Sequence, residues 1–271
     1  MTFRFFPAHV VRSVRLGPSM VRITFGGEEL AGFASGGRDQ SFSLFLPHPG
    51  QEAPVVPVEE GDGWFTAWRA LDPAVRAVMR SYTVREQRRQ PDELDVDFVL
   101  HGVGTAHSGP ASRWAAHASP GDRVLLLGPA VPDNKSVGFR PPADTDWVLL
   151  AADETALPAA AAILDQLPEG TRAKAWLEVP HEADIQPLRT DPAIEVVWLP
   201  RDRTPVSLPE AIRAAALPPG TPYAWLAGES GTVRALRRHL VNERDTDRRR
   251  VTFTGYWRRG VTEEELRAEA G

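Results

Sequence analysis

The chain has 271 residues, of which 42% are hydrophobic and 25% charged, a composition typical of a globular protein and a length that suits two ordinary domains. It carries 31 basic and 36 acidic residues, and the net charge of −5 argues against nucleic acid as a partner. It contains no Cys, which excludes disulfides, thiolate zinc sites, iron–sulfur clusters and Cys nucleophiles, so any redox chemistry requires a bound cofactor.

No segment has the character of a membrane span or a secretion signal. The apolar runs fall short of the roughly 18 residues that a spanning helix needs. The N-terminal residues MTFRFFPAHVVRSVRL carry arginines throughout and lack a continuous apolar core. We therefore expect a soluble, cytoplasmic protein without a membrane partner.

Residues 1–140 are predicted to form an antiparallel β-barrel domain. Short segments mix β-branched or aromatic residues with polar ones, and Gly or Pro clusters separate them. These segments are HVVRSVRL (9–16), SMVRITFGG (19–27), QSFSLFLPHPG (40–50), RSYTVRE (80–86) and LDVDFVLHG (94–102). A single helix is expected among them, in SRWAAHA (112–118), followed by a strand in PGDRVLLLGP (120–129). This spacing of strands and turns is typical of a small barrel.

Residues 141–271 are predicted to form an α/β domain with a parallel sheet. The polar, Pro-rich segment 131–146 has the composition of an exposed connection and holds the domain boundary. After it, apolar strands such as WVLLAA (147–152) alternate with helical patterns such as ALPAAAAILDQL (156–167) and GTVRALRRHLVNE (231–243). At the C-terminus, Thr262 and Glu265 predict a capping box at the start of a short exposed helix.

The segment RSYTVRE combines residue types that suit a flavin. In a strand, Arg80 and Tyr82 point to one face while Ser81 and Thr83 point to the other. An Arg can bind a phosphate, a Tyr can stack on a flat ring, and a Thr hydroxyl can reach a ring nitrogen. Taken alone, the segment is explained better as an ordinary amphipathic strand.

The next segment strengthens the flavin interpretation. GPAS (109–112) begins the predicted helix about a dozen residues after a strand. Free amides at a helix N-terminus bind phosphate oxygens, and Gly109 allows close approach of the backbone. We expect a pyrophosphate to bind there.

The motifs taken together resemble the siderophore-interacting protein family, which comprises FAD-dependent ferric-siderophore reductases of the ferredoxin-reductase-like superfamily. The resemblance rests on RSYT, LHG…GPASRWA…PGD…GP, WVLLAADETALPA, YAWLAGES…VRALRRHL and FTGYWRRG, which occur in the family's order over nearly the whole chain. It implies bound FAD, NADPH or NADH as the electron donor with ferredoxin as a possible alternative, and a ferric siderophore as the substrate. Reduction of Fe(III) to Fe(II) would release the iron.

The resemblance also implies which residues hold FAD. Arg80 would contact a phosphate, Tyr82 would cover the isoalloxazine and Thr83 would lie near the ring nitrogens. The full set is Arg80, Ser81, Tyr82, Thr83, His101, Gly109, Pro110, Ala111, Ser112, Tyr256 and Trp257. Trp114 is expected in the core instead. No side chain is assigned as general acid or base, because the flavin carries the chemistry.

The nicotinamide is expected at the carboxyl edge of the parallel sheet, where open α/β folds bind ligands. The residues placed there are Asp153, Glu154, Thr155 and Ala156, with Gly228, Glu229 and Ser230. A plain strand–helix connection, with Asp and Thr as caps, is the alternative explanation. Arg201 and Arg203 follow a predicted strand, where they could hold the 2′-phosphate of NADPH, although a solvated loop explains them equally well.

The substrate site is expected to be basic, since ferric siderophores are often anionic. Arg140, Arg258 and Arg259 are the candidates, and Ser43 occupies a position where the family resemblance implies Lys. The missing charge favours a hydroxamate over a triscatecholate. His101, His107 and His117 lack carboxylate or Cys partners at ligand spacing, so no protein-bound metal is expected.

Two other functions are compatible with parts of this pattern. One is a general flavin reductase or electron-transfer flavoprotein on the same fold, which only the family resemblance disfavours. The other is a non-catalytic protein that binds a siderophore. The presence of both a flavin segment and a nicotinamide edge argues against this second alternative.

Overall fold

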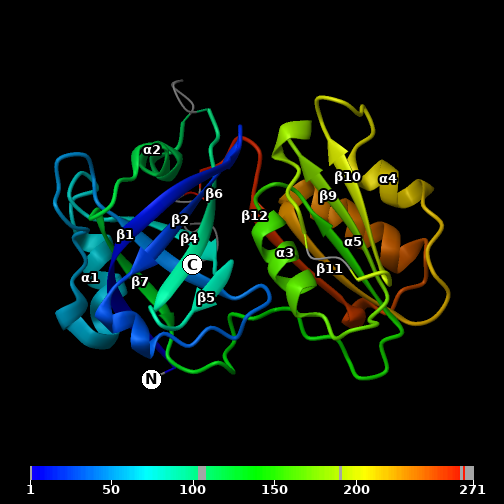
Figure 1. Cartoon of the computed structure of the whole chain (residues 1–271), viewed down its shortest axis with the longest axis horizontal. Coiled ribbons are helices and arrows are strands. Elements are labelled where there is room, and N and C mark those ends of the chain that lie inside the picture. The colour runs from blue at the N-terminus through cyan, green and yellow to red at the C-terminus, as the bar shows by residue number, and fades with distance from the viewer. Residues whose placement is uncertain (1, 103–107, 189–190, 263–264, 266–271) are drawn as a thin grey trace. The chain divides into compact units, whose positions relative to one another are not determined.

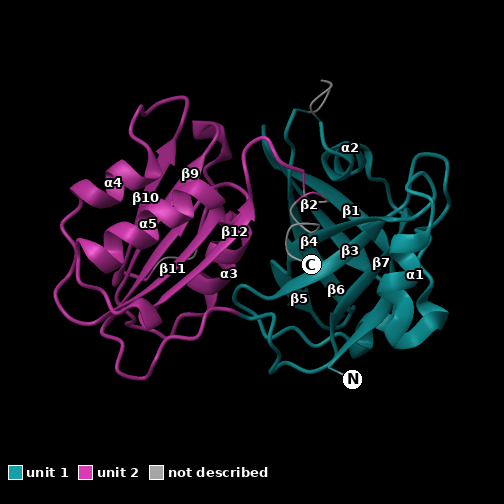
Figure 2. Cartoon of the chain, turned by 180° about the vertical axis from the view of Figure 1, so that it is seen from behind, with its two compact units in different colours: residues 1–137 teal, residues 138–271 magenta. Residues whose placement is uncertain are grey.

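The computed structural model describes residues 2–102, 108–188, 191–262 and 265, and it divides into two compact units. Unit 1 comprises Met1–Val137 and unit 2 comprises Gly138–Gly271, shown in teal and magenta in Figure 2. Each unit has its own sheet and its own core, so each is described by itself.

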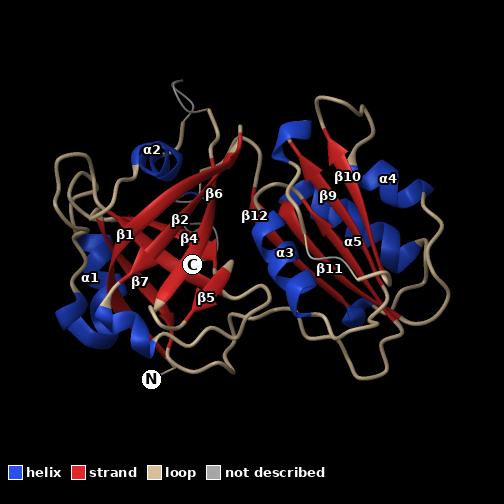
Figure 3. Ribbon diagram, viewed as in Figure 1, coloured by secondary structure: helices blue, strands red, loops and turns tan. Residues whose placement is uncertain are grey.

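Unit 1 is built on a seven-stranded antiparallel sheet that curls around a core (Figures 1 and 3). The strand order is β4-β3-β7-β1-β2-β6-β5. The strands are β1 (Phe3–Gly17), β2 (Met20–Gly26), β3 (Ser41–Leu46), β4 (Val78–Thr83), β5 (Glu86–Arg88), β6 (Glu93–Val99) and β7 (Arg123–Pro129). The predicted antiparallel β domain is confirmed.

Strand β6 shows how residue alternation places the core. Its apolar residues Leu94, Val96 and Phe98 are fully buried in the core cluster. The alternate residues Glu93, Asp95 and Asp97 are acidic and face the other side of the sheet, where arginines of β1, β2 and β5 pair with them. The shortest contacts are 2.9 Å for Arg12–Glu93, 2.7 Å for Arg22–Asp97 and 2.7 Å for Arg88–Asp95.

Unit 1 contains one α-helix that the sequence analysis missed. α2 (Pro110–His117) lies where it was predicted, but α1 (Trp64–Ala70) shows that the expectation of a single helix was wrong. The unit also has two short 3₁₀ helices, η1 (Glu28–Gly32) and η2 (Val58–Gly63). In α1, the ring of Trp64 lies 5.2 Å from Phe5 and 5.7 Å from Phe45. Packing against the sheet, rather than helix propensity, stabilises so short a helix.

Unit 2 is an α/β unit with an entirely parallel five-stranded sheet, as predicted. The strand order is β10-β9-β8-β11-β12. The strands are β8 (Trp147–Ala152), β9 (Ala173–Val179), β10 (Ile194–Pro200), β11 (Pro222–Glu229) and β12 (Val251–Trp257). The central strand β8 is buried over its whole length, which explains its continuous apolar sequence.

Three α-helices cover the two faces of this sheet. α3 (Leu157–Gln166) lies on one face, and α4 (Leu208–Ala214) and α5 (Ser230–Asn242) lie on the other (Figures 1 and 2). Short 3₁₀ turns occur at η3 (Glu182–Asp184) and η4 (Arg248–Arg250). Helices α4 and α5 contribute apolar residues to the core cluster beneath them.

Most of the Pro-rich segment 131–146 is exposed, as expected, but part of it packs against strand β11. Phe139 is 3% exposed, and its ring lies 5.4 Å from the ring of Tyr223 in an edge-on arrangement. The Tyr223 hydroxyl accepts a hydrogen bond from the Arg140 amide at 3.0 Å. The start of unit 2 is therefore anchored to strand β11.

The described residues also bear on the membrane, metal and C-terminal predictions. None of their helices is long and apolar enough to cross a bilayer, and they contain no cluster of three side chains able to hold a metal ion. His107 lies outside the described residues.

The predicted capping box forms, with the Thr262 amide donating to Glu265 Oε2 at 2.7 Å. Most of the helix expected after it also lies outside the described residues.

Candidate functional site

Strand β4 carries the predicted flavin residues on its two faces. Opposite Arg80 and Tyr82 on strand β3 are the buried residues Leu44 and Phe42, so these side chains share the face of the core. The half-buried Tyr82 ring lies 4.3 Å from the ring of Phe98. Alternation puts Ser81 and the buried Thr83 on the other face. The strand brings Arg80 and Tyr82 together but separates them from Thr83.

The N-terminus of α2 is open to an anion. Its N-cap residue is Gly109 in an extended conformation, and no described side chain caps the helix. A Cβ added at Gly109 would meet no atom of the described residues within 4 Å. The hydroxyl of Ser108 is buried without a described hydrogen-bond partner, and such a group in a native fold calls for a ligand or water. Amides at this end can therefore receive a phosphate.

Ser112 has a structural contact that the sequence could not show. Its hydroxyl donates to the carbonyl of Val99 at 2.9 Å and accepts from the amide of His101 at 3.2 Å. These bonds tie α2 to the end of β6. Ser112 thus orients the helix whose amides face the proposed phosphate site.

The described residues of unit 1 fit FAD. They provide a guanidinium at Arg80, a half-exposed aromatic ring at Tyr82 and a helix N-terminus without a capping side chain. His101 follows strand β6 in the sequence, and its side chain is exposed. Trp114 packs with its ring stacked 6.3 Å from that of Phe25, in the core position expected for it.

The carboxyl edge of unit 2 is organised around Asp153. Because all strands are parallel, the ends of β8, β11 and β12 meet at one edge of the sheet. Asp153 Oδ2 accepts from the Trp257 indole Nε1 and from the Glu229 amide, both at 2.8 Å. Asp153 Oδ1 accepts from the amide of Thr155 at 2.9 Å and from its hydroxyl at 2.5 Å. The carboxylate joins residues that follow or end three different strands.

Asp153 is buried, with 5% of its surface exposed. Burial raises the pKa of Asp153, and the neighbouring charge of Glu154 raises it further, while the bonds from Thr155, Trp257 and Glu229 act in the opposite direction. Thr155, Trp257 and the Glu229 amide all donate hydrogen bonds, which suits an ionised carboxylate, because its oxygens only accept.

Gly228 is required by this arrangement. Its φ of 137° lies in a region that side-chain-bearing residues rarely adopt, and a Cβ there would lie 2.5 Å from Asp153 Oδ2. The next residue, Glu229, caps helix α5 by accepting from the Thr232 amide at 2.8 Å. Ser230 donates to the carbonyl of Trp257 at 2.9 Å. The AGES and GYW segments are therefore held together.

Two of the remaining predicted nicotinamide residues, Glu154 and Arg201, form a separate ionic group. Glu154 is 2% exposed and binds Arg201 through both carboxylate oxygens, at 2.7 and 2.8 Å. Arg201 also donates to Glu178 at 3.0 Å. These contacts raise the pKa of Arg201 above its ordinary value. Arg203 instead pairs with Glu182 on the surface, at 3.0 Å with both side chains well exposed.

The predicted substrate arginines do not form one cluster within unit 2. Arg140 lies at the start of the unit and is exposed. Arg258 and Arg259 follow β12, where Arg258 is half-buried and the Arg259 amide donates to Glu229 Oε1 at 3.4 Å. In unit 1, Ser43 lies opposite Ser81 in the β3–β4 pair and is half-buried.

Two contacts in these sites were absent from the sequence analysis: Trp257 with Asp153 and Arg201 with Glu154. The partners are 104 and 47 residues apart, and only the order of the strands brings them together. The only sequence feature that could have indicated these contacts was the position of each residue at the end of a predicted strand.

Comparisons with known proteins match both units. A model of the siderophore-interacting FAD-binding domain matches residues 9–133, and a model of the siderophore-interacting protein matches residues 145–260. Ferric vibriobactin reductase ViuB of Vibrio cholerae serotype O1 is 34% identical, over 96% of this chain and 91% of that protein. The NADPH-dependent ferric-chelate reductase of Escherichia coli K12 is 29% identical, over 94% and 93%. The crystal structure of a siderophore utilization protein from T. fusca has a TM-score of 0.80 and 34% identity, over 97% and 95%.

Proposed function

The chain belongs to the siderophore-interacting protein family, and from this membership we propose that it is an FAD-dependent ferric-siderophore reductase. Electrons from NAD(P)H reduce Fe(III) to Fe(II), which hard oxygen ligands hold more weakly, so the iron is released. The observation that carries the proposal is that the similarity to named ferric reductases extends over both units of the chain.

In this proposal unit 1 holds FAD. When bound, FAD supplies chemistry that the side chains lack, since it accepts two electrons together from a nicotinamide and releases them singly. Arg80 and the amides that begin α2 bind its phosphates, and Tyr82 covers its ring system. Within unit 1, Ser81, Thr83 and His101 complete the proposed set. No side chain is required as an acid or base.

The carboxyl edge of unit 2 receives the nicotinamide in this proposal. Asp153 already accepts four hydrogen bonds, so its role is to position Trp257 and Glu229 rather than to bind the nucleotide. Thr155, Ala156, Gly228 and Ser230 line the same edge. The proposed donor also places the reaction in the cytoplasm, where NAD(P)H is available.

We propose that NADPH is preferred over NADH and that Arg203 contributes more to this preference than Arg201. The Arg203–Glu182 pair is exposed and contributes little stability, so its guanidinium can turn to a 2′-phosphate at small cost. Arg201 is bound to the buried Glu154. Arg203→Ala should lower the ratio of kcat/KM for NADPH to that for NADH by about tenfold, the loss of one charge-assisted contact. An unchanged ratio would remove Arg203 from the site.

The substrate is proposed to be a ferric hydroxamate. Ser43 contributes no positive charge, which lowers the affinity expected for a triscatecholate of higher negative charge. Ser43→Lys should raise turnover of a ferric triscatecholate relative to a ferric hydroxamate, and Ser43→Gln, which is large but uncharged, is the control. If both variants change the two rates equally, the inference from charge fails.

The decisive experiment is anaerobic visible spectroscopy of the FAD-supplemented protein. NADPH alone should bleach the flavin bands, and a ferric hydroxamate added afterwards should restore them. Bleaching that occurs only when reduced ferredoxin is present would identify ferredoxin as the donor. Bands that stay bleached would indicate a different acceptor, and failure to bind FAD would refute the proposed function.

A further inference from the structure

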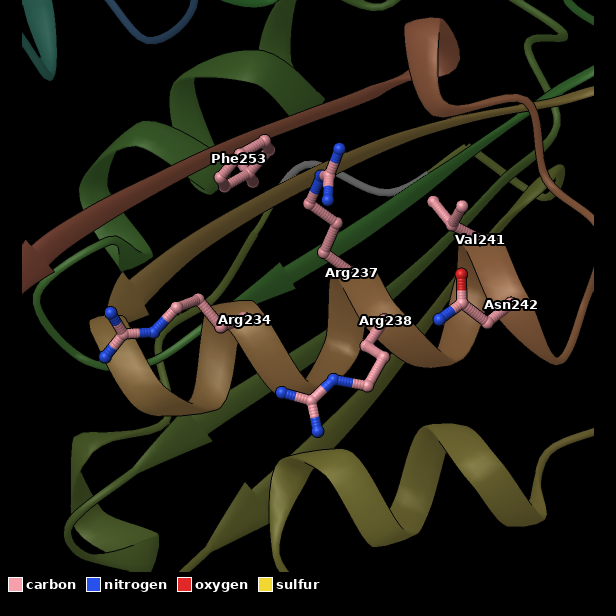
Figure 4. A pocket seen from close by; sticks show the side chains of 6 residues that line it. All are labelled: Arg234, Arg237, Arg238, Val241, Asn242 and Phe253. Carbon is pink, nitrogen blue, oxygen red and sulfur yellow. The ribbon is translucent and has the colours of Figure 1, made fainter.

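Helix α5 and strand β12 border a hollow of about 410 Å³ in unit 2. It is lined by Arg234, Arg237, Arg238, Val241, Asn242 and Phe253 (Figure 4). These residues lie along the body of α5 and in the middle of β12, whereas the proposed nicotinamide site lies at the strand ends. The hollow is therefore separate from that site, and its volume is within the range of small-molecule pockets.

The three arginines of the hollow have no acidic partner among the residues that the structure describes. Arg234 lies three residues before Arg237 and four before Arg238, so it is one helical turn from each, whereas the adjacent Arg237 and Arg238 leave the helix on different sides (Figure 4). No hydrogen bond or ion pair joins their guanidinium groups to any residue that the structure describes. By contrast, Arg249 and Arg250 nearby pair with Asp247 and Asp144. Positive charge is thus concentrated at the hollow, in a chain whose net charge is −5.

The hollow also has an aromatic wall. Phe253 is 44% exposed and lines the hollow, so part of its ring is accessible there. The guanidinium of Arg237 lies over its ring, 4.7 Å from the ring centre. Arg237 Nε is buried without an acceptor among the described residues. In Figure 4, Arg237 points toward Phe253, while Arg234 and Arg238 extend along and below the helix.

We infer that this hollow binds a small anion that carries a planar aromatic group, of the nucleoside diphosphate class. Arg234 and Arg238 bind the phosphates, because guanidinium groups form paired hydrogen bonds with phosphate oxygens. The base lies against Phe253 and the Arg237 guanidinium, both of which stack on flat rings. The Asn242 amide supplies a donor and an acceptor for the base edge. An inorganic anion alone would use only the arginines and leave Phe253 without a role.

The test uses ADP as the probe on FAD-loaded full-length protein with NADP⁺ in excess, so that the proposed FAD and nicotinamide sites are already filled. Binding is followed by ¹⁵N NMR at the Asn242 side-chain amide and at Arg237 Nε–H. ADP should shift both signals saturably. Arg234→Ala/Arg238→Ala should weaken this binding at least about tenfold. The control Arg123→Ala/Arg172→Ala, which removes two exposed arginines elsewhere, should not weaken it.

Pyrophosphate and adenosine separate the two halves of the inference. Both should bind more weakly than ADP, and Phe253→Ala should weaken ADP binding without affecting pyrophosphate. Pyrophosphate that binds as tightly as ADP would refute the aromatic part. Absence of a saturable shift, or equal binding by the α5 double variant, would refute the site. Reduction of the flavin by NADPH should be unchanged in every α5 variant, so the outcome is independent of the proposed function.

Discussion

Gly228→Ala tests the organisation of the carboxyl edge around Asp153. The added methyl group would lie 2.5 Å from Asp153 Oδ2, at a φ of 137°. The backbone strain alone costs about 1–2 kcal/mol. Moving the carboxylate away also breaks its bonds from Trp257 and the Glu229 amide, and because both donors are only partly buried, each one left without an acceptor costs about 1–1.5 kcal/mol. We expect a total loss of about 3–5 kcal/mol in the free energy of unfolding.

Gly170→Ala is the matched control in the same unit. Gly170 also has a positive φ, of 76°, but its added Cβ would meet no atom of the described residues within 4 Å, so this variant carries only the backbone cost of about 1–2 kcal/mol. Urea unfolding measures both variants, and the NMR signal of the Trp257 indole, assigned with Trp257→Phe, reports on its bond to Asp153. Equal losses for the two variants, together with an unmoved indole signal, would refute the reasoning.

Two further predictions concern ion pairs. The hydrogen bond from Arg12, aided by Arg88 and opposed by burial, holds the pKa of Glu93 below its ordinary value. The ionised Glu93 carboxylate therefore stabilises the folded protein fully above its unfolded pKa of about 4.3, and this contribution is lost as the pH falls through the folded pKa. Urea unfolding between neutral and acidic pH should therefore show a smaller acid-induced loss in Glu93→Gln than in the wild type, and an equal loss would contradict this assignment. Arg201→Ala should destabilise the protein by about 3 kcal/mol because Glu154 stays buried without its partner, whereas Arg203→Ala should stay within about 0.5 kcal/mol. Thermal unfolding compares these two variants, and similar midpoints would show that the Glu154 contact contributes little.

The fold was predictable where residue pattern and burial agree. The alternation in β6 and the continuous apolar run in β8 each follow from how many faces of the strand are buried, and both were assigned correctly. Helix α1 was missed because its residues WFTAWRA have no capping side chain, and contacts with Phe5 and Phe45 stabilise it.

The candidate site was predictable only to the level of strand ends. The motifs placed Asp153, Glu154 and Arg201 at the edge of a parallel sheet, and the structure has them there. Their contacts depend on strand order and on rotamers, which no local pattern encodes. Arg201 was expected either to hold a 2′-phosphate or to lie in a solvated loop, but it is bound by the buried Glu154.

The paired carboxylates of β6 have a consequence for how this strand finds its alignment during folding. A slip of one residue against β2 would turn Leu94, Val96 and Phe98 toward the charged side and drive three carboxylates into the core. The arginines of β1, β2 and β5 would also lose their carboxylate partners. A misaligned pairing would therefore be unfavourable on both faces of the sheet. The ion pairs thus help to select the correct register in the unit that carries the proposed flavin site.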